Sequence, residues 1–336
     1  GSGSSATISA NEILSNTALS GAGGGIRVAD NETQAEITGN DIEGNRAKGG
    51  GGIEVSTFAT ATIDRNVIIR NLSGEWNDGG LTLYEHATAT ISKNTIAYNT
   101  TQDQRGTSAI TIADDSTATV DSNMIMNNNA EHCITVVNSS ASVMFTNNIV
   151  ANNDCVGVLI HGGSQNVTII NNTISAGRYD AILVWGPTAS ASLIRNNIVT
   201  DSNFGINAGD GGTIVRMDHN NAYGNDRGDY NYDSALSEAN NISQDPRFVD
   251  AANGDYRLRS DSPSIDSGTV VDAPDHDMLG TARPQGSGLD MGAYEMSYPK
   301  IYLPSISTAA SCLPPIPVGP LDGSQLDTLV PLFQFR

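Results

Sequence analysis

The stretch Ala89–Asn99 reads ATISKNTIAYN, and close copies, ATIDRNVIIRN and ATVDSNMIMNN, begin at Ala61 and Ala118. In each copy an apolar anchor residue is followed three positions later by asparagine and five positions later by isoleucine. The anchor and its asparagine occur nine times, at spacings of 24 to 29 residues, and the isoleucine is present in eight of the nine, with Ala222 in the last. Self-similarity at a period of this length indicates a solenoid, in which each period forms one turn of the chain.

An asparagine stands three residues after every anchor. Asparagine tolerates left-handed backbone angles, and its amide bonds to backbone groups, so it suits a sharp turn. Stacked on successive turns, such amides form a ladder that satisfies buried polar groups. The expected ladder consists of Asn11, Asn40, Asn66, Asn94, Asn123, Asn147, Asn172, Asn196 and Asn220. A second row, interrupted at Gly177 and Asp201, consists of Asn16, Asn45, Asn71, Asn99, Asn128, Asn152 and Asn225.

Between the anchors lie short alternating runs such as GGIRV, GGIEV and GGLTL, each with two inward apolar positions. Alternation of this kind predicts strands, and no helical periodicity is present. Each period therefore holds about three short strands separated by turns. We predict an all-β fold, a parallel β-helix of about nine coils over residues 1–225, and the general crossover rule favours the right-handed form.

Composition limits the partners of this chain. Seventeen basic residues against 37 acidic ones give a formal charge of −20, which repels nucleic acid and anionic membranes. The apolar runs are far shorter than the roughly 20 residues that span a bilayer. Cations, neutral glycans and basic protein surfaces remain as natural partners.

The repeat over residues 6 to 225 resembles the right-handed parallel β-helix repeat family found in pectate-lyase-like proteins. The motif is specific for the fold and poorly specific for activity. Members include polysaccharide lyases, glycoside hydrolases, epimerases, phage tailspikes and noncatalytic surface proteins. The resemblance implies that substrate-binding residues project outward from the strands that follow the glycine pairs.

A different organisation begins after the repeats. Residues 226–296 are expected to cover the open end of the solenoid. Within them, DPRFVDAANGDYRLRSDSPSIDSG and DMLGTARPQGSGLDMGAYE resemble the choice-of-anchor Q region of exported bacterial proteins, which implies an extracellular or surface location. Residues 297–320 form a Pro/Ser-rich linker. Residues 321–336 resemble the start of a further β module or a docking strand, through which the chain would self-assemble into a fibre.

The outer face of the strands after the glycine pairs is the expected place for chemistry. A uronate lyase needs cations and a base, and this face offers one arginine and no lysine. An inverting glycosidase needs two nearby carboxylates, whereas Glu54 stands alone in this row. The face consists of Arg27, Glu54, Thr82, Thr111, Thr135, Leu159, Leu183 and Asn207.

Side chains in the adjacent turns are the catalytic candidates. Asp114 and Asp115 share one turn, and Glu85 and His86 lie one coil away; solvated turn residues are the alternative. His161 is a further candidate. Together with Tyr84 and Trp185, it also suggests a sugar-binding surface, because an aromatic face packs against a pyranose ring.

Acidic clusters suggest calcium. Asp272, Asp275 and Asp277 stand close together before Gly280, and a second group consists of Asp218, Asp226, Asp229 and Asp233. Closely spaced carboxylates suit Ca²⁺, although neither group has the full EF-hand pattern and acidic turns are the alternative. No other cofactor is expected.

Two of the three cysteines occupy equivalent positions in the repeat. Cys133 and Cys155 precede equivalent strands on neighbouring coils, so they form either a disulfide or two buried thiols; Cys312 has no partner in this segment.

A strong repeat beside few catalytic groups favours a structural, adhesive or glycan-binding surface protein. A polysaccharide lyase or glycoside hydrolase is the alternative.

Overall fold

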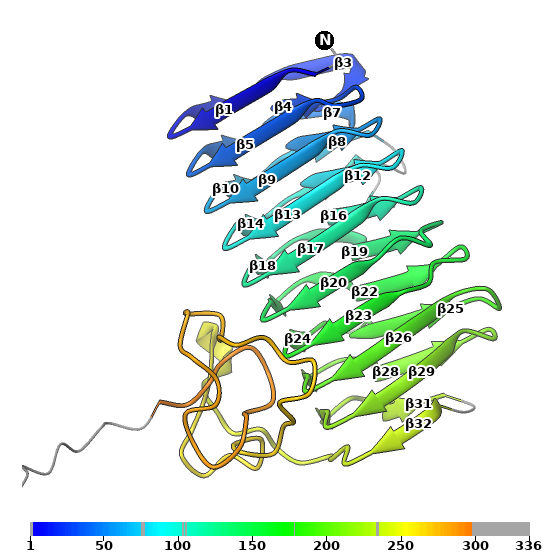
Figure 1. The fold of residues 1–336 in the computed structure, drawn as a ribbon, viewed down its shortest axis with the longest axis vertical. Helices are drawn as coiled ribbons and strands as arrows, with labels where there is room; N and C mark the ends of the chain where they lie inside the picture. The colour runs from blue at the N-terminus through cyan, green and yellow to red at the C-terminus, as the bar shows by residue number, and fades with distance from the viewer. Residues whose placement is uncertain are drawn as a thin grey trace, which may run out of the picture. The chain divides into compact units, whose positions relative to one another are not determined.

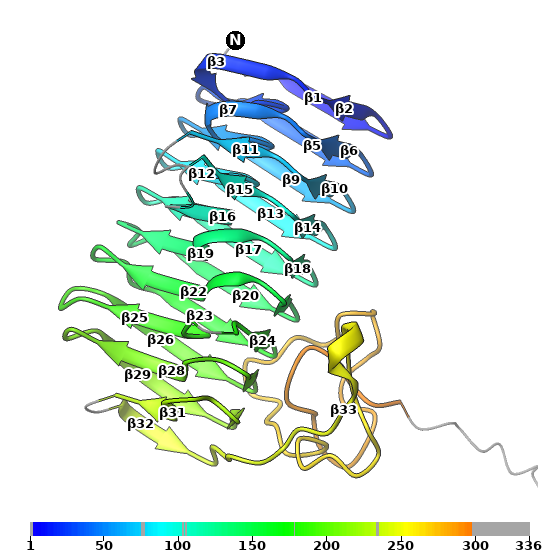
Figure 2. The same ribbon diagram turned by 180° about the vertical axis from the view of Figure 1, so that it is seen from behind.

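The computed structural model describes residues 3–74, 78–102, 104, 106–177, 179–232 and 235–297. The linker, the expected docking strand and Cys312 lie outside the described residues, as does Asp233. The described chain is a parallel β-solenoid whose strands stack in three sheets (Figures 1 and 2). The predicted fold is confirmed.

Sheet A has 10 strands, all parallel. They are β1 (Ser5–Ser9), β5 (Gln34–Thr38), β9 (Thr60–Asp64), β13 (Thr88–Ser92), β17 (Thr117–Asp121), β20 (Val143–Thr146), β23 (Val167–Ile170), β26 (Ser190–Arg195), β29 (Thr213–Asp218) and β32 (Ala235–Ala239). Sheet B has nine strands, one in each of nine coils. They are β2 (Glu12–Leu14), β6 (Asp41–Glu43), β10 (Val67–Ile69), β14 (Thr95–Ala97), β18 (Met124–Met126), β21 (Ile149–Ala151), β24 (Thr173–Ser175), β27 (Ile198–Thr200) and β30 (Asn221–Tyr223).

Sheet C has 13 strands. Each early coil contributes two strands, separated by a bend of the chain, so the sheet has two arms. Strand β19 (Asn129–Val137) joins the arms, because it pairs with a strand of each. One arm consists of β3 (Thr17–Ala22), β7 (Arg46–Gly49), β11 (Leu72–Ser73) and β15 (Thr100–Thr101). The other consists of β4 (Ile26–Val28), β8 (Ile53–Ser56), β12 (Leu81–Tyr84) and β16 (Thr107–Ala113). Beyond β19 the sheet continues with β22 (Asp154–His161), β25 (Ile182–Trp185), β28 (Phe204–Gly209) and β31 (Gly228–Asn231).

Glycine makes the bend of sheet C possible in the early coils. A Cβ atom on Gly51 would lie 2.5 Å from the carbonyl oxygen of Gly79 in the next coil. No side chain fits there without moving backbone. The glycine pairs in the sequence therefore mark the inside of the bend.

The asparagine ladder is present, and its members between the two end coils are buried. The amide of Asn66 donates to Oδ1 of Asn94 at 3.0 Å, and the backbone N–H of Asn66 donates to the same oxygen at 2.9 Å. The second Nδ2 hydrogen of Asn66 reaches the carbonyl of Ile37 at 2.8 Å. The ladder runs through Asn11, Asn40, Asn66, Asn94, Asn123, Asn148, Asn172, Asn197, Asn220 and Asn241.

Two ladder positions were predicted one residue too early. Asn148 and Asn197 occupy the ladder in place of Asn147 and Asn196. The register explains the error, because Val120 pairs with Phe145 rather than with Met144. The second row shows the same shift, since Asn128 donates to Asn153 and not to Asn152.

The solenoid extends one coil beyond residue 225. Strands β31 and β32 pair with β28 and β29, and Asn241 closes the ladder. The sequence pattern missed this coil because its anchor position, opposite Met217, is occupied by Glu238. The repeat is recognised by its apolar anchors, so a coil with an acidic residue at that position does not match the pattern.

Residues 243–297, here called the flank segment, pack against the side of the solenoid. They contain the hairpin β33 (Phe248–Asp250) and β34 (Asp255–Leu258), joined by a 3-10 helix, η1 (Ala251–Asn253). Tyr256 packs with Ile149 of β21, and Leu258 packs with Ile198 of β27. Figures 1 and 2 show the segment beside β24, on the side of the solenoid, whereas the sequence predicted that it covers the open end.

A disulfide joins Cys133 and Cys155, whose Cα atoms lie 5.4 Å apart on neighbouring coils, as one of the two sequence alternatives predicted. Both cysteines are buried. The bridge closes a separation of 22 residues.

Reduction of this disulfide is expected to lower the free energy of unfolding by about 3 kcal/mol, because a loop of this length restricts the unfolded chain by about that amount. Urea unfolding with and without a thiol reductant measures the difference. The Cys133→Ala/Cys155→Ala variant should unfold at the same urea concentration in both conditions. A reductant effect on that variant would show that the loss has another origin.

Candidate functional site

The outward row predicted on sheet C exists as a continuous register. Arg27 pairs with Glu54, Glu54 with Thr82, and Thr82 with Thr111. The row continues through Thr135, Leu159, Leu183 and Asn207. Several of these outward residues are nevertheless buried, Glu54 among them with 1% exposure.

The bend of sheet C explains this burial, because side chains from the two sides of the bend meet across it. Asp78 stands just before the bend and pairs with Thr107 in the next coil. Its carboxylate accepts hydrogen bonds from the hydroxyls of Thr82, at 3.0 Å, and of Thr111. In the following coils Thr107 bonds to Thr135 at 2.7 Å in the same manner.

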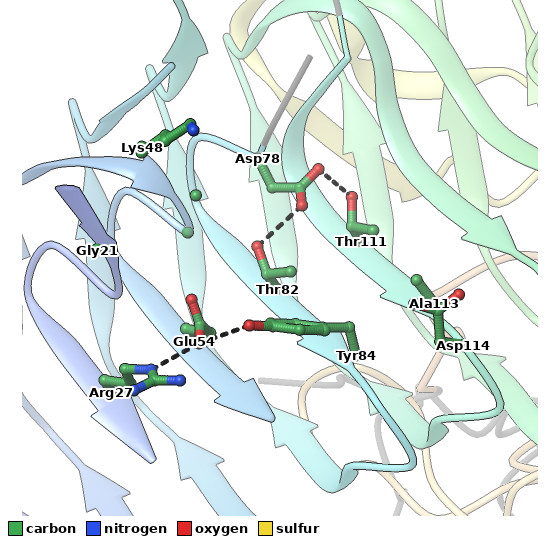
Figure 3. A pocket seen from close by; sticks show the side chains of 12 residues that line it. Gly21, Arg27, Lys48, Glu54, Asp78, Thr82, Tyr84, Thr111, Ala113 and Asp114 are labelled. Carbon is green, nitrogen blue, oxygen red and sulfur yellow. Dashed lines mark hydrogen bonds and ion pairs between the residues drawn. The ribbon is translucent and has the colours of Figure 1, made fainter. Parts of the chain in front are cut away.

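A cleft of about 540 Å³ opens at this corner (Figure 3). We call it the corner cleft. Its lining comprises Gly21, Arg27, Lys48, Gly49, Gly50, Glu54, Asp78, Thr82, Tyr84, Thr111, Ala113 and Asp114. Lys48, on β7, reaches the cleft from the other arm and adds a cation that the outward row itself lacks.

Glu54 is almost fully buried in the cleft, and its carboxylate accepts three side-chain hydrogen bonds. It accepts hydrogen bonds from Arg27 Nε at 2.9 Å, from Ser56 Oγ at 3.1 Å and from the Tyr84 hydroxyl at 3.3 Å. Burial and the charge of Glu54 raise the pKa of Tyr84. Hydrogen bonding to Glu54 likewise raises the pKa of Arg27. The tyrosine therefore acts as a neutral donor and the arginine stays charged.

Asp78 has an unusually high proton affinity for a carboxylate. Burial raises the pKa of Asp78 to about 6, against the opposing effect of the two threonine hydroxyls, and the negative charge of Glu54 adds to the rise. Asp78 therefore exchanges its proton near neutral pH. The cleft thus holds two carboxyl groups, and that of Asp78 can serve as a proton donor near neutral pH.

Sequence reasoning missed Asp78, although a signal was present. The glycines before the bend read Gly23-Gly24-Gly25 in one repeat and Gly50-Gly51-Gly52 in the next, whereas Asp78 replaces the first glycine in the third. The replacement places a carboxylate at the bend, where a glycine would leave open space.

The four turn residues predicted as catalytic candidates lie on neighbouring turns, where three of the side chains have separate partners. Asp114 lies at the edge of the corner cleft. Asp115 instead binds Ser140 of the next coil through its backbone N–H at 2.8 Å and its hydroxyl at 2.6 Å, which lowers the Asp115 pKa. Glu85 accepts from a threonine hydroxyl of the preceding coil at 2.8 Å, and His86 stacks on a phenylalanine of that coil at 4.8 Å. The contacts of Asp115, Glu85 and His86 therefore link turns of neighbouring coils.

The predicted aromatic surface is divided. Tyr84 lies in the corner cleft, whereas Trp185 and His161 lie farther along sheet C. The Trp185 ring, 48% exposed, lies against Gly209 of the next strand and makes no recorded ring contact with His161 within the described residues. Burial lowers the pKa of His161, so this side chain is neutral at pH 7.

The three aspartates predicted to bind calcium each have a different protein partner. Asp272 pairs with Arg195 at 2.9 Å, and Asp275 bonds to His276 at 2.7 Å. Asp277 is buried and accepts backbone N–H groups within its own turn. Within the described residues no group of three metal-ligand side chains converges, so the predicted cluster is not formed there. Calcium binding remains an untested prediction.

Stacked parallel coils with an internal asparagine ladder define the right-handed parallel β-helix class. The family model described as "Right handed beta helix region" matches residues 1–174, and the chain belongs to that family. The chain is also similar to a solved structure titled "Crystal structure of pectate lyase Pel9A", with a TM-score of 0.53 and 13% identity. That similarity covers 85% of this chain and 88% of the other, and it shows the fold alone. No curated protein matches the chain significantly in sequence.

The described residues include no helix that is long and apolar enough to cross a membrane.

Proposed function

We propose that this β-helix binds an extracellular polysaccharide in the corner cleft and serves an adhesive or structural role at a surface. The supporting observation is the cleft itself, where Glu54 of one coil and Asp78 and Tyr84 of the next face one space. Such a mixture of hydroxyl, carboxylate and aromatic groups suits sugar hydroxyls and the apolar face of a pyranose. The disulfide fits an oxidising compartment outside the cytosol.

Replacement of Tyr84 by alanine is expected to weaken polysaccharide binding about tenfold or more, because it removes both an aromatic surface and a hydroxyl donor. Affinity electrophoresis in gels containing xylan, glucomannan, β-glucan or polygalacturonate measures the effect. Tyr98→Ala, which changes an exposed tyrosine in the turn after β14, is the matched control and should leave mobility unchanged. Equal retardation of Tyr84→Ala and the parent in every gel would exclude the corner cleft as the site.

A glycoside hydrolase is the second candidate, and the raised pKa of Asp78 beside Glu54 favours it. In this reaction Asp78 would donate its proton to the leaving oxygen, and Glu54 would act as the carboxylate partner. A general acid must be protonated, so cleavage should decline as pH rises through about 6, the pKa of Asp78.

Release of new reducing ends from the polysaccharides above, followed from pH 4 to pH 8, tests this second candidate. Asp78→Asn should lower the rate about 100-fold or more, since it removes the acid while preserving the shape of the side chain. Unchanged polysaccharide binding by the same variant would separate catalysis from recognition. If no polysaccharide is cleaved at any pH while binding is retained, the hydrolase candidate is excluded and only the binding role remains.

A further inference from the structure

A second cleft lies between the outer face of sheet A and the flank segment. Its volume is about 560 Å³. Strands β13, β17 and β20 form one wall, and the loop Asp272–His276 of the flank segment forms the other. We call it the flank cleft. It shares no residue with the corner cleft, which opens on sheet C.

The sheet wall of the flank cleft is amphipathic. Thr90 and Thr119 pair in register on β13 and β17, and both are exposed. Neither threonine hydroxyl has a recorded hydrogen-bond partner among the described residues. Next in the same row stands Met144, which is 39% exposed, and Pro274 lies in the facing loop. Along the solenoid axis, two neighbouring threonine hydroxyls are thus followed by the apolar surface of Met144.

The histidine and the three carboxylates of the flank cleft have protein partners. His276 bonds through Nδ1 to Asp275 at 2.7 Å and through Nε2 to Asp121 at 3.3 Å. Both contacts raise the pKa of His276, the first more strongly. Asp121 also accepts hydrogen bonds from Thr146 and Ser122, and Asp272 pairs with Arg195. The carboxylates that could bind a free cation are therefore already occupied by protein groups.

We propose that the flank cleft is a second carbohydrate site, which holds a neutral, extended polysaccharide chain along the solenoid axis. Hydroxyl side chains repeat there at the strand spacing of about 4.8 Å. Apolar atoms of Met144 and Pro274 offer a surface for the C–H face of a sugar ring. A polyanion is disfavoured, because Asp121, Asp272 and Asp275 outnumber Lys93 and His276 in the lining.

Two carbohydrate sites on different sheets would let one molecule hold two polysaccharide strands. The proposal for the flank cleft does not depend on the corner cleft, since the residues differ. It gives a physical basis for adhesion, because bivalent binding multiplies the strength of attachment without new contacts.

Titration calorimetry with cello-, xylo-, manno- and chito-oligosaccharides tests the flank cleft. The Thr90→Val/Thr119→Val variant keeps the side-chain shape and removes two hydroxyls, and it should bind about tenfold more weakly. Thr62→Val is the matched control, because Thr62 pairs with Thr90 in the same row and lies outside the cleft. Met144→Asp, which places a charge on the apolar surface, should also abolish binding.

Three outcomes would overturn the proposal. They are the absence of binding by every oligosaccharide, an equal loss in Thr62→Val, and tighter binding of oligogalacturonate than of any neutral chain. Thermal unfolding of each variant verifies that the coils are intact. Tyr84→Ala should retain binding at the flank cleft, so failure of the corner cleft and failure of the flank cleft are distinguishable.

Discussion

Replacement of Asn94 by alanine is expected to lower the free energy of unfolding by about 4 kcal/mol. Oδ1 of Asn94 accepts two hydrogen bonds from Asn66, and its Nδ2 donates to the carbonyl of Ile63 at 2.8 Å and to Asn123 at 3.0 Å. All these groups are buried in the turn, so alanine leaves several of them without partners. Each orphaned buried group costs about 1 to 3 kcal/mol.

Urea unfolding followed by far-UV circular dichroism measures this loss. Asn127→Ala is the matched control, because Asn127 is an exposed asparagine of a neighbouring turn with φ of 57°. Its loss should stay near 1 kcal/mol, the cost of a left-handed angle for alanine. Losses of similar size in both variants would show that turn geometry, and not the ladder, stabilises the coil.

The asparagine doublets show how far the sequence could predict the structure. Asn147, Asn171 and Asn196 each precede a ladder asparagine in the later coils, whereas the early coils carry single asparagines. The first members of the doublets bind the flank segment: Asn196 exchanges hydrogen bonds with the backbone of Thr269 at 2.8 and 3.0 Å. Asn171 donates to the carbonyl of Asp290 at 3.0 Å. Periodicity alone could not decide which asparagine of a doublet faces inward.

The apolar residues beside the doublets carry the same information. Ile149 and Ile198 matched the repeat pattern, but Val150 and Val199 occupy the stacked core positions on sheet B. The displaced isoleucines face the flank segment. A strand that is apolar on both faces indicates a surface covered by another part of the chain. This signal was visible in the sequence, although it does not name the segment that covers the strand.

The corner cleft could be predicted only in part. Alternation within each strand placed Glu54 and Tyr84 on the outer face correctly. Asp78 and Lys48 come from the far side of the bend, and the angle of that bend depends on how the glycine pairs stack between coils. Proximity across the bend is a tertiary property, so strand periodicity carries no information on it.

Replacement of Arg283 by methionine is expected to destabilise the flank segment by about 3 to 5 kcal/mol, the cost of leaving a buried charge unpaired. Arg283 and Glu295 are almost fully buried and lie 3.1 Å apart. Arg283 also donates to the carbonyls of Asp290, at 3.0 Å, and of Gly292, at 2.9 Å, and to Oδ1 of Asn147 on the solenoid. Methionine fills similar space and satisfies none of these acceptors. Hydrogen exchange of the backbone amides in residues 245–296 measures the loss of protection.

Arg257→Met is the matched control, because Arg257 pairs with Asp255 in the same segment with 60% of its side chain exposed. Water screens an exposed pair, so it contributes little and protection should barely change. The double variant Arg283→Met/Glu295→Gln should recover part of the loss, since it removes the unpaired charge. Amides of the early coils, remote from the flank segment, should keep their protection in every variant. Equal loss of protection there would mean that Arg283 stabilises the solenoid as a whole, and not the attachment of the segment to its side.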